Sequence, residues 1–351
     1  MTDQLKKRFD KLLIFQNYFS PSRHAVFEQL GKYCCLTVAY MQSPQDEGRQ
    51  WAEDRPINYQ VIRIPTFRIS KLILPIPSYQ FPKQIEAVVV VDNNPTNIAM
   101  ILIARKIVSR SSRSYVWIEH IPDRSKSYGK TLYQTITSRK LLQLSGSAAS
   151  FSSMTDEYIR GLKFTGAINR IPQAVSNPNS EFRFRSVESA SRFGYLGSDV
   201  ERKNVASLRT AINDVEESDI SLHLAGGDFT NLTDRETCYG YVAGDELNRF
   251  FDKIDVLVLP SIIDPWGLVV NEALLRGRLV IVTHNCGSSE IVKKIDKNLV
   301  CDVTPESIKN ALLYANSLSR SDIRGRIESA NAILQNYTID AAVRAFENLL
   351  I

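Results

Sequence analysis

Residues 256–292 read VLVLPSIIDPWGLVVNEALLRGRLVIVTHNCGSSEIV, and the fold class of the second half of the chain can be predicted from this segment. Its first four residues form an apolar run that predicts a buried strand, and the loop that follows contains proline and glycine. Residues 268–276 then predict a helix, and residues 279–283 predict a second buried strand. Strand, helix and strand in this order are typical of a parallel sheet with crossover helices.

The loop and the helix start in this stretch have the features of a site for a nucleoside diphosphate. A helix N-terminus presents N–H groups without intrahelical partners and a partial positive charge, which suits a diphosphate. Asp264 precedes the helix, and Glu272 lies eight residues later, inside it. A carboxylate about one and a half turns into the helix can reach the hydroxyls of a ribose, as in dinucleotide sites.

The rest of the 351-residue chain shows the same rhythm of strands and helices, without a sequence repeat. We expect further strands at 11–15, 35–40, 87–91, 115–118, 193–196 and 220–225. The segment Ser176–Ser191 is rich in Ser and Asn and is expected to be a linker. The predicted fold class is α/β, with two Rossmann-like domains, 1–180 and 190–337, facing a cleft where ligands bind. Residues 338–351 are expected to form a last helix that packs back on the first domain.

The composition excludes several classes of protein. Apolar residues make up 44% of the chain and charged residues 23%, which excludes a disordered or collagen-like protein. No run approaches the ~18–20 apolar residues of a membrane span, and the polar N-terminus is not expected to be a signal peptide. The five cysteines form no Cys-x-x-Cys pair, so neither a disulfide framework nor a zinc site is predicted. The cytoplasm is the expected location.

Charge is distributed unevenly along the chain. Residues 1–190 contain 26 Lys and Arg against 15 Asp and Glu, whereas residues 191–351 contain 17 against 23. A basic half suggests an anionic partner, for which nucleic acid, an acidic membrane and a phosphorylated substrate are alternatives. A plain difference in surface composition is the remaining explanation.

The stretch 256–292 resembles the donor-binding signature of retaining GT-B glycosyltransferases, the large group 1 family that uses nucleotide sugars. In that family a P-S-x-x-E-P-x-G loop precedes an E-A pair, with seven residues between the two carboxylates. Asp264 and Glu272 have this spacing. Further segments resemble other parts of the family pattern: FGYLGSDVERK at 193–203, LHLAGGD at 222–228, YGYVA at 239–243 and IPQAV at 171–175.

The resemblance implies roles for residues on the donor side. Lys203 matches a lysine that contacts the donor diphosphate, and Arg202 is expected to replace the charge of an arginine that is Ser198 here. Glu272 is implied to accept hydrogen bonds from the ribose hydroxyls, and Asp264 to lie near the transferred sugar. The other implied donor-binding residues are Trp266, Gly267, Leu268, Val269 and Tyr241. The alternatives are a solvated loop lysine, a partly exposed helix carboxylate and an aspartate that caps the following turn.

The resemblance also implies residues on the opposite wall of the site. His120 matches a histidine at a strand end that faces the sugar and donates a hydrogen bond to it. The loop Asn17–His24 takes the place of a glycine-rich loop, where Asn17 can adopt a left-handed backbone and His24 is expected on the acceptor side. For each histidine the alternative is a packed side chain at the end of a strand or the start of a helix.

The activity implied is sugar transfer from a UDP-sugar or GDP-mannose to a hydroxyl of a glycan or lipid-linked acceptor, with retention of configuration. Such transfer would serve the synthesis of cell-surface polysaccharide or glycolipid, with Lys203, Asp264 and His120 as its catalytic residues. No D-x-D sequence stands near a strand end, so neither a metal ion nor a cofactor is expected. The rival functions are a phosphorylase or sugar-phosphate synthase of the same fold, and an inactive nucleotide-sugar-binding or complex-forming protein. Nucleic-acid binding is disfavoured because the donor motif lies in the acidic half, and an oxidoreductase because no G-x-G-x-x-G follows the first strand.

The basic half is then predicted to face the acceptor. Its cations are expected to hold the protein on the anionic inner face of a membrane, at about 1 kcal/mol per residue that reaches the surface. A lipid diphosphate is the alternative partner. The residues concerned are Arg105, Lys106, Arg110, Arg113, Arg124, Lys126, Lys130, Arg139 and Lys140.

Overall fold

The structure is a computed structural model, and it describes residues 11–43, 55–69, 72–76, 84–94, 96–107, 114–119, 121, 128–175, 190–216 and 219–350. The chain forms two compact units. The N-terminal unit combines Met1–Ser176 with Tyr337–Ile351, and the C-terminal unit is Asn177–Asn336. The last helix of the chain therefore belongs to the same unit as the first strand.

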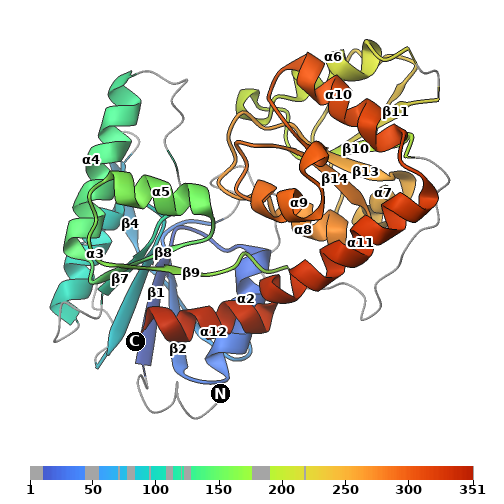
Figure 1. The fold of residues 1–351 in the computed structure, drawn as a ribbon. Helices are drawn as coiled ribbons and strands as arrows, with labels where there is room; N and C mark the ends of the chain where they lie inside the picture. The colour runs from blue at the N-terminus through green and yellow to red at the C-terminus, as the bar shows by residue number, and fades with distance from the viewer. Residues whose placement is uncertain are drawn as a thin grey trace. The chain divides into compact units, whose positions relative to one another are not determined.

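The N-terminal unit is built on a seven-stranded parallel sheet (Figure 1) with the order β3-β2-β1-β6-β7-β8-β9. Its strands are β1 (Lys11–Gln16), β2 (Cys35–Tyr40), β3 (Gln60–Arg63), β6 (Ala87–Val91), β7 (Ser114–Trp117), β8 (Ser147–Ser150) and β9 (Ala167–Arg170). A two-stranded hairpin, β4 (Thr66–Ile69) and β5 (Leu72–Pro75), follows β3. The helices are α2 (Pro21–Gly31), α3 (Thr96–Ile107), α4 (Tyr128–Leu144), α5 (Ser153–Gly161) and α12 (Ile339–Leu349).

The helices pack on both faces of the sheet, and successive side chains of each strand point alternately toward one face and the other. Leu13 and Phe15 of β1 lie in one core cluster with buried residues of α3, α4 and α5. Their neighbours in β1 point to the opposite face, because successive strand side chains alternate. On that face α12 packs against α2 and against β8 and β9. The ring centroids of Trp117 in β7 and Phe346 in α12 are 5.4 Å apart, so aromatic packing joins the C-terminal helix to this sheet.

The C-terminal unit contains a six-stranded parallel sheet with the order β12-β11-β10-β13-β14-β15. Its strands are β10 (Arg192–Leu196), β11 (Ser221–Ala225), β12 (Glu236–Cys238), β13 (Val256–Leu259), β14 (Leu279–Thr283) and β15 (Val300–Cys301). Its α-helices are α6 (Val205–Asn213), α7 (Asp245–Lys253), α8 (Leu268–Leu275), α9 (Ser289–Ile295), α10 (Pro305–Asn316) and α11 (Arg320–Leu334). Short 3-10 helices are η3 (Glu201–Lys203), η4 (Lys297–Leu299) and η5 (Gln335–Tyr337).

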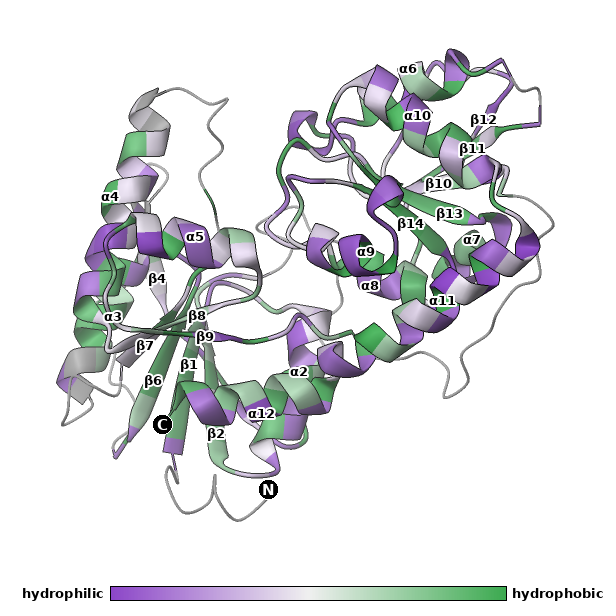
Figure 2. Ribbon diagram, in the orientation of Figure 1, coloured by the Kyte–Doolittle hydropathy of each residue, from purple (hydrophilic) through white to green (hydrophobic). Residues whose placement is uncertain are grey.

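The predicted α/β class with two Rossmann-like sheets is confirmed. The strands expected at 35–40, 87–91, 256–259 and 279–283 have the bounds of β2, β6, β13 and β14. All four are buried along most of their length, and the strands of both sheets are predominantly hydrophobic in Figure 2. Strands that are covered on both faces appear as continuous apolar runs, which explains why the sequence reveals them. Within the described ranges, none of the helices combines the length and the apolar content that a membrane crossing requires.

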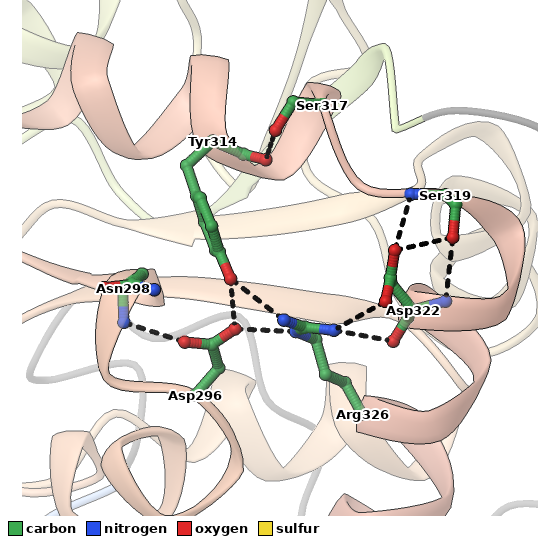
Figure 3. Close-up of polar contacts among 7 residues, drawn as sticks. All are labelled: Asp296, Asn298, Tyr314, Ser317, Ser319, Asp322 and Arg326. Carbon is green, nitrogen blue, oxygen red and sulfur yellow. Dashed lines mark hydrogen bonds and ion pairs between the residues drawn. The ribbon is translucent and has the colours of Figure 1, made fainter.

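A cluster of charged and hydroxyl side chains joins three consecutive helices of the C-terminal unit (Figure 3). Asp296, which follows α9, accepts hydrogen bonds of 2.6 Å from Tyr314 of α10 and from Nε of Arg326 of α11. The backbone N–H of Asn298 donates to its other oxygen. Burial opposes ionisation of Asp296, but these three donors prevail and lower its pKa. The cluster therefore contributes to stability while Asp296 is charged.

Replacement of Arg326 by Gln is expected to lower the free energy of unfolding by about 2 kcal/mol at neutral pH, since Asp296 loses its cation. A carboxyl group whose pKa is lowered by folding contributes its full stabilisation at pH values above its ordinary, unfolded-state pKa. This contribution disappears as the pH falls through the pKa of the folded state. The difference between variant and wild type should therefore shrink below about pH 4. Urea unfolding at pH 7 and at acidic pH measures both quantities.

The control is Arg324→Gln on the same helix. Arg324 pairs with Glu328, and both side chains are more than 60% exposed, so its loss should cost less than about 0.5 kcal/mol. Equal losses in the two variants would contradict the assigned role of Asp296.

Candidate functional site

Two loops of the C-terminal unit meet at the carboxyl edge of its sheet. β10 and β13 are parallel neighbours, so the loops that leave them emerge side by side. Nζ of Lys203, after β10, lies 2.5 Å from Oδ2 of Asp264, after β13. The side chains are 16% and 11% exposed, which makes this a largely buried ion pair between residues 61 positions apart. The structure therefore brings together two residues that the sequence singled out separately.

Backbone contacts hold Asp264 in place. Its N–H donates to the carbonyl of Asn285, and the N–H of Gly287 donates to its carbonyl. Asp264 also forms an isolated parallel bridge with Cys286. Its carboxylate accepts a 3.3 Å hydrogen bond from the N–H of Trp266, the capping contact considered as an alternative role. The residue pairs with Lys203 and caps its own turn at the same time.

The lysine loop is anchored to the loop that contains Asp264. Asn204 adopts a left-handed backbone with φ of 57°, which asparagine tolerates better than most residues. Its side-chain amide donates to the carbonyls of Pro260 and Val303. The N–H of Ile262 donates to the carbonyl of Arg202. Asn204 was not among the residues predicted from the sequence, where its position directly after the basic pair was its only signal.

The N-terminus of α8 lies directly after Asp264. Gly267 has φ of 87°, and a Cβ there would lie 2.4 Å from the side chain of Leu259. The amides at Gly267, Leu268 and Val269 belong to the first turn, where a helix leaves N–H groups without intrahelical acceptors. The indole of Trp266 is buried, and its N–H donates to the side chain of Asn271 at 2.9 Å.

Glu272 is the fifth residue of α8 and is partly exposed. Burial raises its pKa, and the nearby Arg276 opposes this effect. The guanidinium of Arg276 donates to the side chain of Asn248 and lies 4.7 Å from the ring centroid of Phe251. The carboxylate is thus placed within one helical turn of a cation whose own position is fixed.

Tyr241 follows β12 at the same edge of the sheet and is 43% exposed. The turn beside it is held by a hydrogen bond from the N–H of Gly226 to the carbonyl of Gly240. Gly226 has φ of 92°, and a Cβ there would lie 2.7 Å from the backbone nitrogen of Gly197. The two glycines therefore allow the turns after β10 and β11 to approach each other.

The candidates in the N-terminal unit have different surroundings. Asn17 donates to the carboxylate of Asp92 at 3.1 Å. The left-handed residue here is Asp92, with φ of 79°, and Asn17 does not use the left-handed backbone that was considered open to it. Nδ1 of His24 lies 2.9 Å from the hydroxyl of Tyr59 in an aromatic cluster. These contacts fit the alternative role, a histidine packed at the start of a helix. His120 lies outside the described residues.

A buried ion pair that was not predicted from the sequence lies near this loop. Arg23, in the first turn of α2, pairs with Glu119, which follows β7. The guanidinium lies 4.7 Å from the ring centroid of Trp117, and burial lowers the pKa of Arg23 to about 10. Arg23 and Trp117 line a small pocket together with Gln173, and among the residues that the structure describes the buried indole N–H of Trp117 has no hydrogen-bond acceptor. No spacing rule connects Arg23 with Glu119, so the sequence contained no signal for this pair.

Across the parts of the chain that the structure describes, no three His, Cys, Asp or Glu side chains gather in a group that could hold a metal ion. Lys203, through its ion pair with Asp264, is a cation beside the N-terminus of α8.

Comparison with known proteins agrees with the resemblance that the donor loop shows to glycosyltransferases. Residues 190–316 match the family model described as glycosyl transferases group 1. An uncharacterized glycosyltransferase from Methanocaldococcus jannaschii is 37% identical over 70 residues, which cover 20% of this chain. The match spans 18% of that relative's length.

Solved structures resemble the whole chain at low sequence identity. Sucrose-phosphate synthase from Thermosynechococcus elongatus has a TM-score of 0.71 at 14% identity, covering 97% of this chain and 98% of that one. Anabaena HepE, in complex with UDP and glucose, has a TM-score of 0.70 at 12% identity, covering 97% and 99%. WaaG, a glycosyltransferase involved in lipopolysaccharide biosynthesis, has a TM-score of 0.68 at 12% identity with the same coverage. The chain therefore has the GT-B fold, and its residues 190–316 match the group 1 glycosyltransferase domain.

Proposed function

We propose that the protein transfers a sugar from a UDP-sugar or GDP-mannose to a hydroxyl of a glycan or lipid-linked acceptor, with retention of configuration. The observation that carries this proposal is the contact between Lys203 and Asp264 beside the N-terminus of α8. A cation, a carboxylate and a helix N-terminus in one place suit a diphosphate linked to a polyhydroxylated sugar. The family match over residues 190–316 agrees with this chemistry, and the likeness to solved structures supports its fold alone.

In the proposed reaction the bond between the anomeric carbon and the diphosphate oxygen breaks, and the acceptor oxygen forms the new bond. The acceptor proton passes to the leaving diphosphate. Lys203, Arg202 and the amides of the first turn of α8 stabilise the negative charge that develops on the diphosphate, in place of a metal ion. Donors that are already oriented toward developing charge are usually the largest catalytic contribution.

Glu272 is proposed to bind the ribose of the donor. Its ionised carboxylate would accept hydrogen bonds from the two vicinal hydroxyls. Because burial raises the pKa of Glu272, protonation should begin at a higher pH than for an exposed glutamate. Donor affinity should therefore fall as the pH is lowered from 7 toward this raised pKa.

Replacement of Glu272 by Gln is expected to weaken UDP or GDP binding about tenfold or more, since hydrogen bonds to a charged acceptor are lost. Calorimetric titration with UDP and with GDP, at pH 7 and at pH 5.5, measures the dissociation constants and their pH dependence. The control is Glu306→Gln at the exposed start of α10, which should bind like wild type. Equal binding by both variants would refute the assignment of Glu272.

Turnover assays then separate the proposed activity from its rivals. Wild-type protein is incubated with labelled UDP-glucose, UDP-N-acetylglucosamine or GDP-mannose, together with lipid-linked and free glycan acceptors. Glucose 6-phosphate and inorganic phosphate serve as alternative acceptors. Transfer only to a phosphate acceptor would identify a synthase or phosphorylase, and donor binding without any turnover would identify a binding protein.

A further inference from the structure

Helices α3 and α4 of the N-terminal unit cover the same face of its sheet, and their outer sides are unusually apolar. Leu141 and Leu142 of α4 lie in the core. The same helix exposes Leu132, Tyr133 and Ile136 by 44%, 55% and 58%. A surface helix ordinarily exposes its polar side and buries its apolar one, whereas α4 has large apolar side chains on both sides.

The exposed residues of α4 form one continuous stripe. Its exposed positions are Gly129, Leu132, Tyr133, Ile136, Arg139, Lys140 and Gln143. At ~100° per residue, they fall within an arc of roughly 120°. We call this stripe the outer face of α4. Its first half is apolar, and its second half begins with two adjacent cations, Arg139 and Lys140.

Helix α3 repeats this arrangement on a smaller scale. Leu102 is 45% exposed, and the exposed Lys106 lies one turn further along the helix. Neither TNIAMILIARKI of α3 nor YGKTLYQTITSRKLLQL of α4 contains an acidic residue. The two helices pack against each other, and neither of them contains an acidic partner for the exposed cations that both carry.

We propose that the outer face of α4, with Leu102 and Lys106 of α3, binds a lipid bilayer that contains anionic headgroups. Leu132, Tyr133 and Ile136 would enter the boundary between headgroups and acyl chains, where tyrosine and aliphatic side chains are favoured. The cations Lys106, Arg139 and Lys140 would contact the anionic headgroups. Both components are needed, because one class of side chain alone gives weak, reversible binding.

The charge of this surface favours a bilayer over other occupants. In a two-fold dimer the same patch meets itself, so the cations of α3 and α4 would face each other without an acidic residue from either helix. A nucleic acid would bind the cations through its phosphates but would leave the aliphatic side chains of Leu132 and Ile136 exposed to water. An anionic bilayer matches both halves of the stripe.

Binding to the bilayer would select acceptors that are carried by lipids. This substrate class rests on the proposed transferase function, whereas bilayer binding itself does not. Binding is therefore measured without donor or acceptor, so its outcome is independent of the outcome of the turnover assays.

The test is co-sedimentation of the full chain with vesicles of phosphatidylcholine, with or without phosphatidylglycerol. Wild type should bind the anionic vesicles. Arg139→Gln/Lys140→Gln should bind about 25-fold more weakly, from about fivefold per basic residue near an anionic surface. Leu132→Ser/Ile136→Ser should bind at least about tenfold more weakly, since two half-exposed apolar side chains no longer enter the bilayer. Circular dichroism and thermal melting confirm that each variant is folded.

Matched controls lie in the C-terminal unit. Lys293→Gln/Lys294→Gln removes two adjacent exposed cations of α9, and Leu232→Ser removes a side chain that is 42% exposed. Both should bind like wild type. In Tyr133→Trp, the added indole fluorescence should shift to the blue with anionic vesicles and be quenched by brominated acyl chains, and inorganic phosphate should cause neither effect.

Unchanged binding of both α4 double variants would overturn the proposal. Light scattering without lipid supplies a second criterion. If wild type is a dimer and Leu132→Ser/Ile136→Ser is a monomer, the surface is an interface between two copies and the proposal is wrong. A response of Tyr133→Trp to inorganic phosphate alone would likewise replace the bilayer with a free anion.

Discussion

Replacement of Lys203 by Met is expected to lower kcat/KM for sugar transfer by about 100- to 1,000-fold, the usual effect of removing one oriented donor to developing negative charge. The ammonium is held by Asp264 at 2.5 Å and by a loop that Asn204 fixes to Pro260 and Val303. It is therefore already placed beside the first turn of α8 before the donor arrives. Steady-state kinetics with a saturating acceptor measure the effect.

Stability supplies an independent readout for the same variant. Lys203→Met leaves the largely buried carboxylate of Asp264 without its cation, which should cost roughly 3 kcal/mol. Adding Asp264→Asn removes the unpaired charge, so the double variant should regain most of the stability but none of the activity. Lys253→Met, at an exposed position in the last turn of α7, should leave both quantities unchanged. Recovery of transfer in the double variant would show that Lys203 serves stability alone.

The donor loops could be predicted because their residues lie at the ends of strands that the sequence reveals. β10 and β13 are short apolar runs, and each is followed by a loop with glycine or proline. Parallel strands place such loops at one edge of the sheet, so Lys203 and Asp264 were both expected near the donor. Their mutual contact was not expected, because spacing along the chain does not determine which side chains pair across an edge.

Several elements of the N-terminal unit could not be predicted. α4 carries apolar residues on its core side and on its outer face, so it lacks the one-sided pattern by which amphipathic helices are recognised. β8 consists of Ser147–Ser150, with the sequence SAAS, and has little intrinsic strand preference. The strands β3 and β9 are sheet edges with mostly exposed or half-buried residues. In each case the packing of the folded chain, and not the local sequence, determines the structure.

The polar groups near the acceptor loop show the same limit. The loop that begins at Asn17 was expected to take the place of a glycine-rich loop, and a left-handed backbone was considered open to Asn17. The left-handed residue is Asp92, which lies 75 positions away and accepts the hydrogen bond of Asn17. Glu119 was not singled out from the sequence, and the structure pairs it with Arg23. Such contacts arise because Asn17 follows β1, Asp92 follows β6 and Glu119 follows β7, at one edge of one sheet.

Replacement of Arg23 by Met is expected to lower the free energy of unfolding of the N-terminal unit by about 3 kcal/mol, since Glu119 loses its cation in a site that is largely buried. The Arg23 side chain is 13% exposed and that of Glu119 is 20% exposed. Burial lowers the pKa of Arg23 to about 10, so the site disfavours an isolated charge. Met preserves the contact with the ring of Trp117, so the loss reports the charge and not the packing.

The double variant Arg23→Met/Glu119→Leu separates a broken pair from a lost contact. Replacing both members of a buried ion pair by apolar residues is often neutral, so this variant should regain most of the stability in urea unfolding. The control is Arg63→Met, which removes a guanidinium 5.5 Å from the ring of Tyr40 at an exposed site and should cost less than about 1 kcal/mol. If the double variant is as unstable as Arg23→Met, the charge of Arg23 acts through other neighbours, such as the ring of Trp117 and the carboxylate of Asp92, and the ion pair with Glu119 adds nothing to the fold.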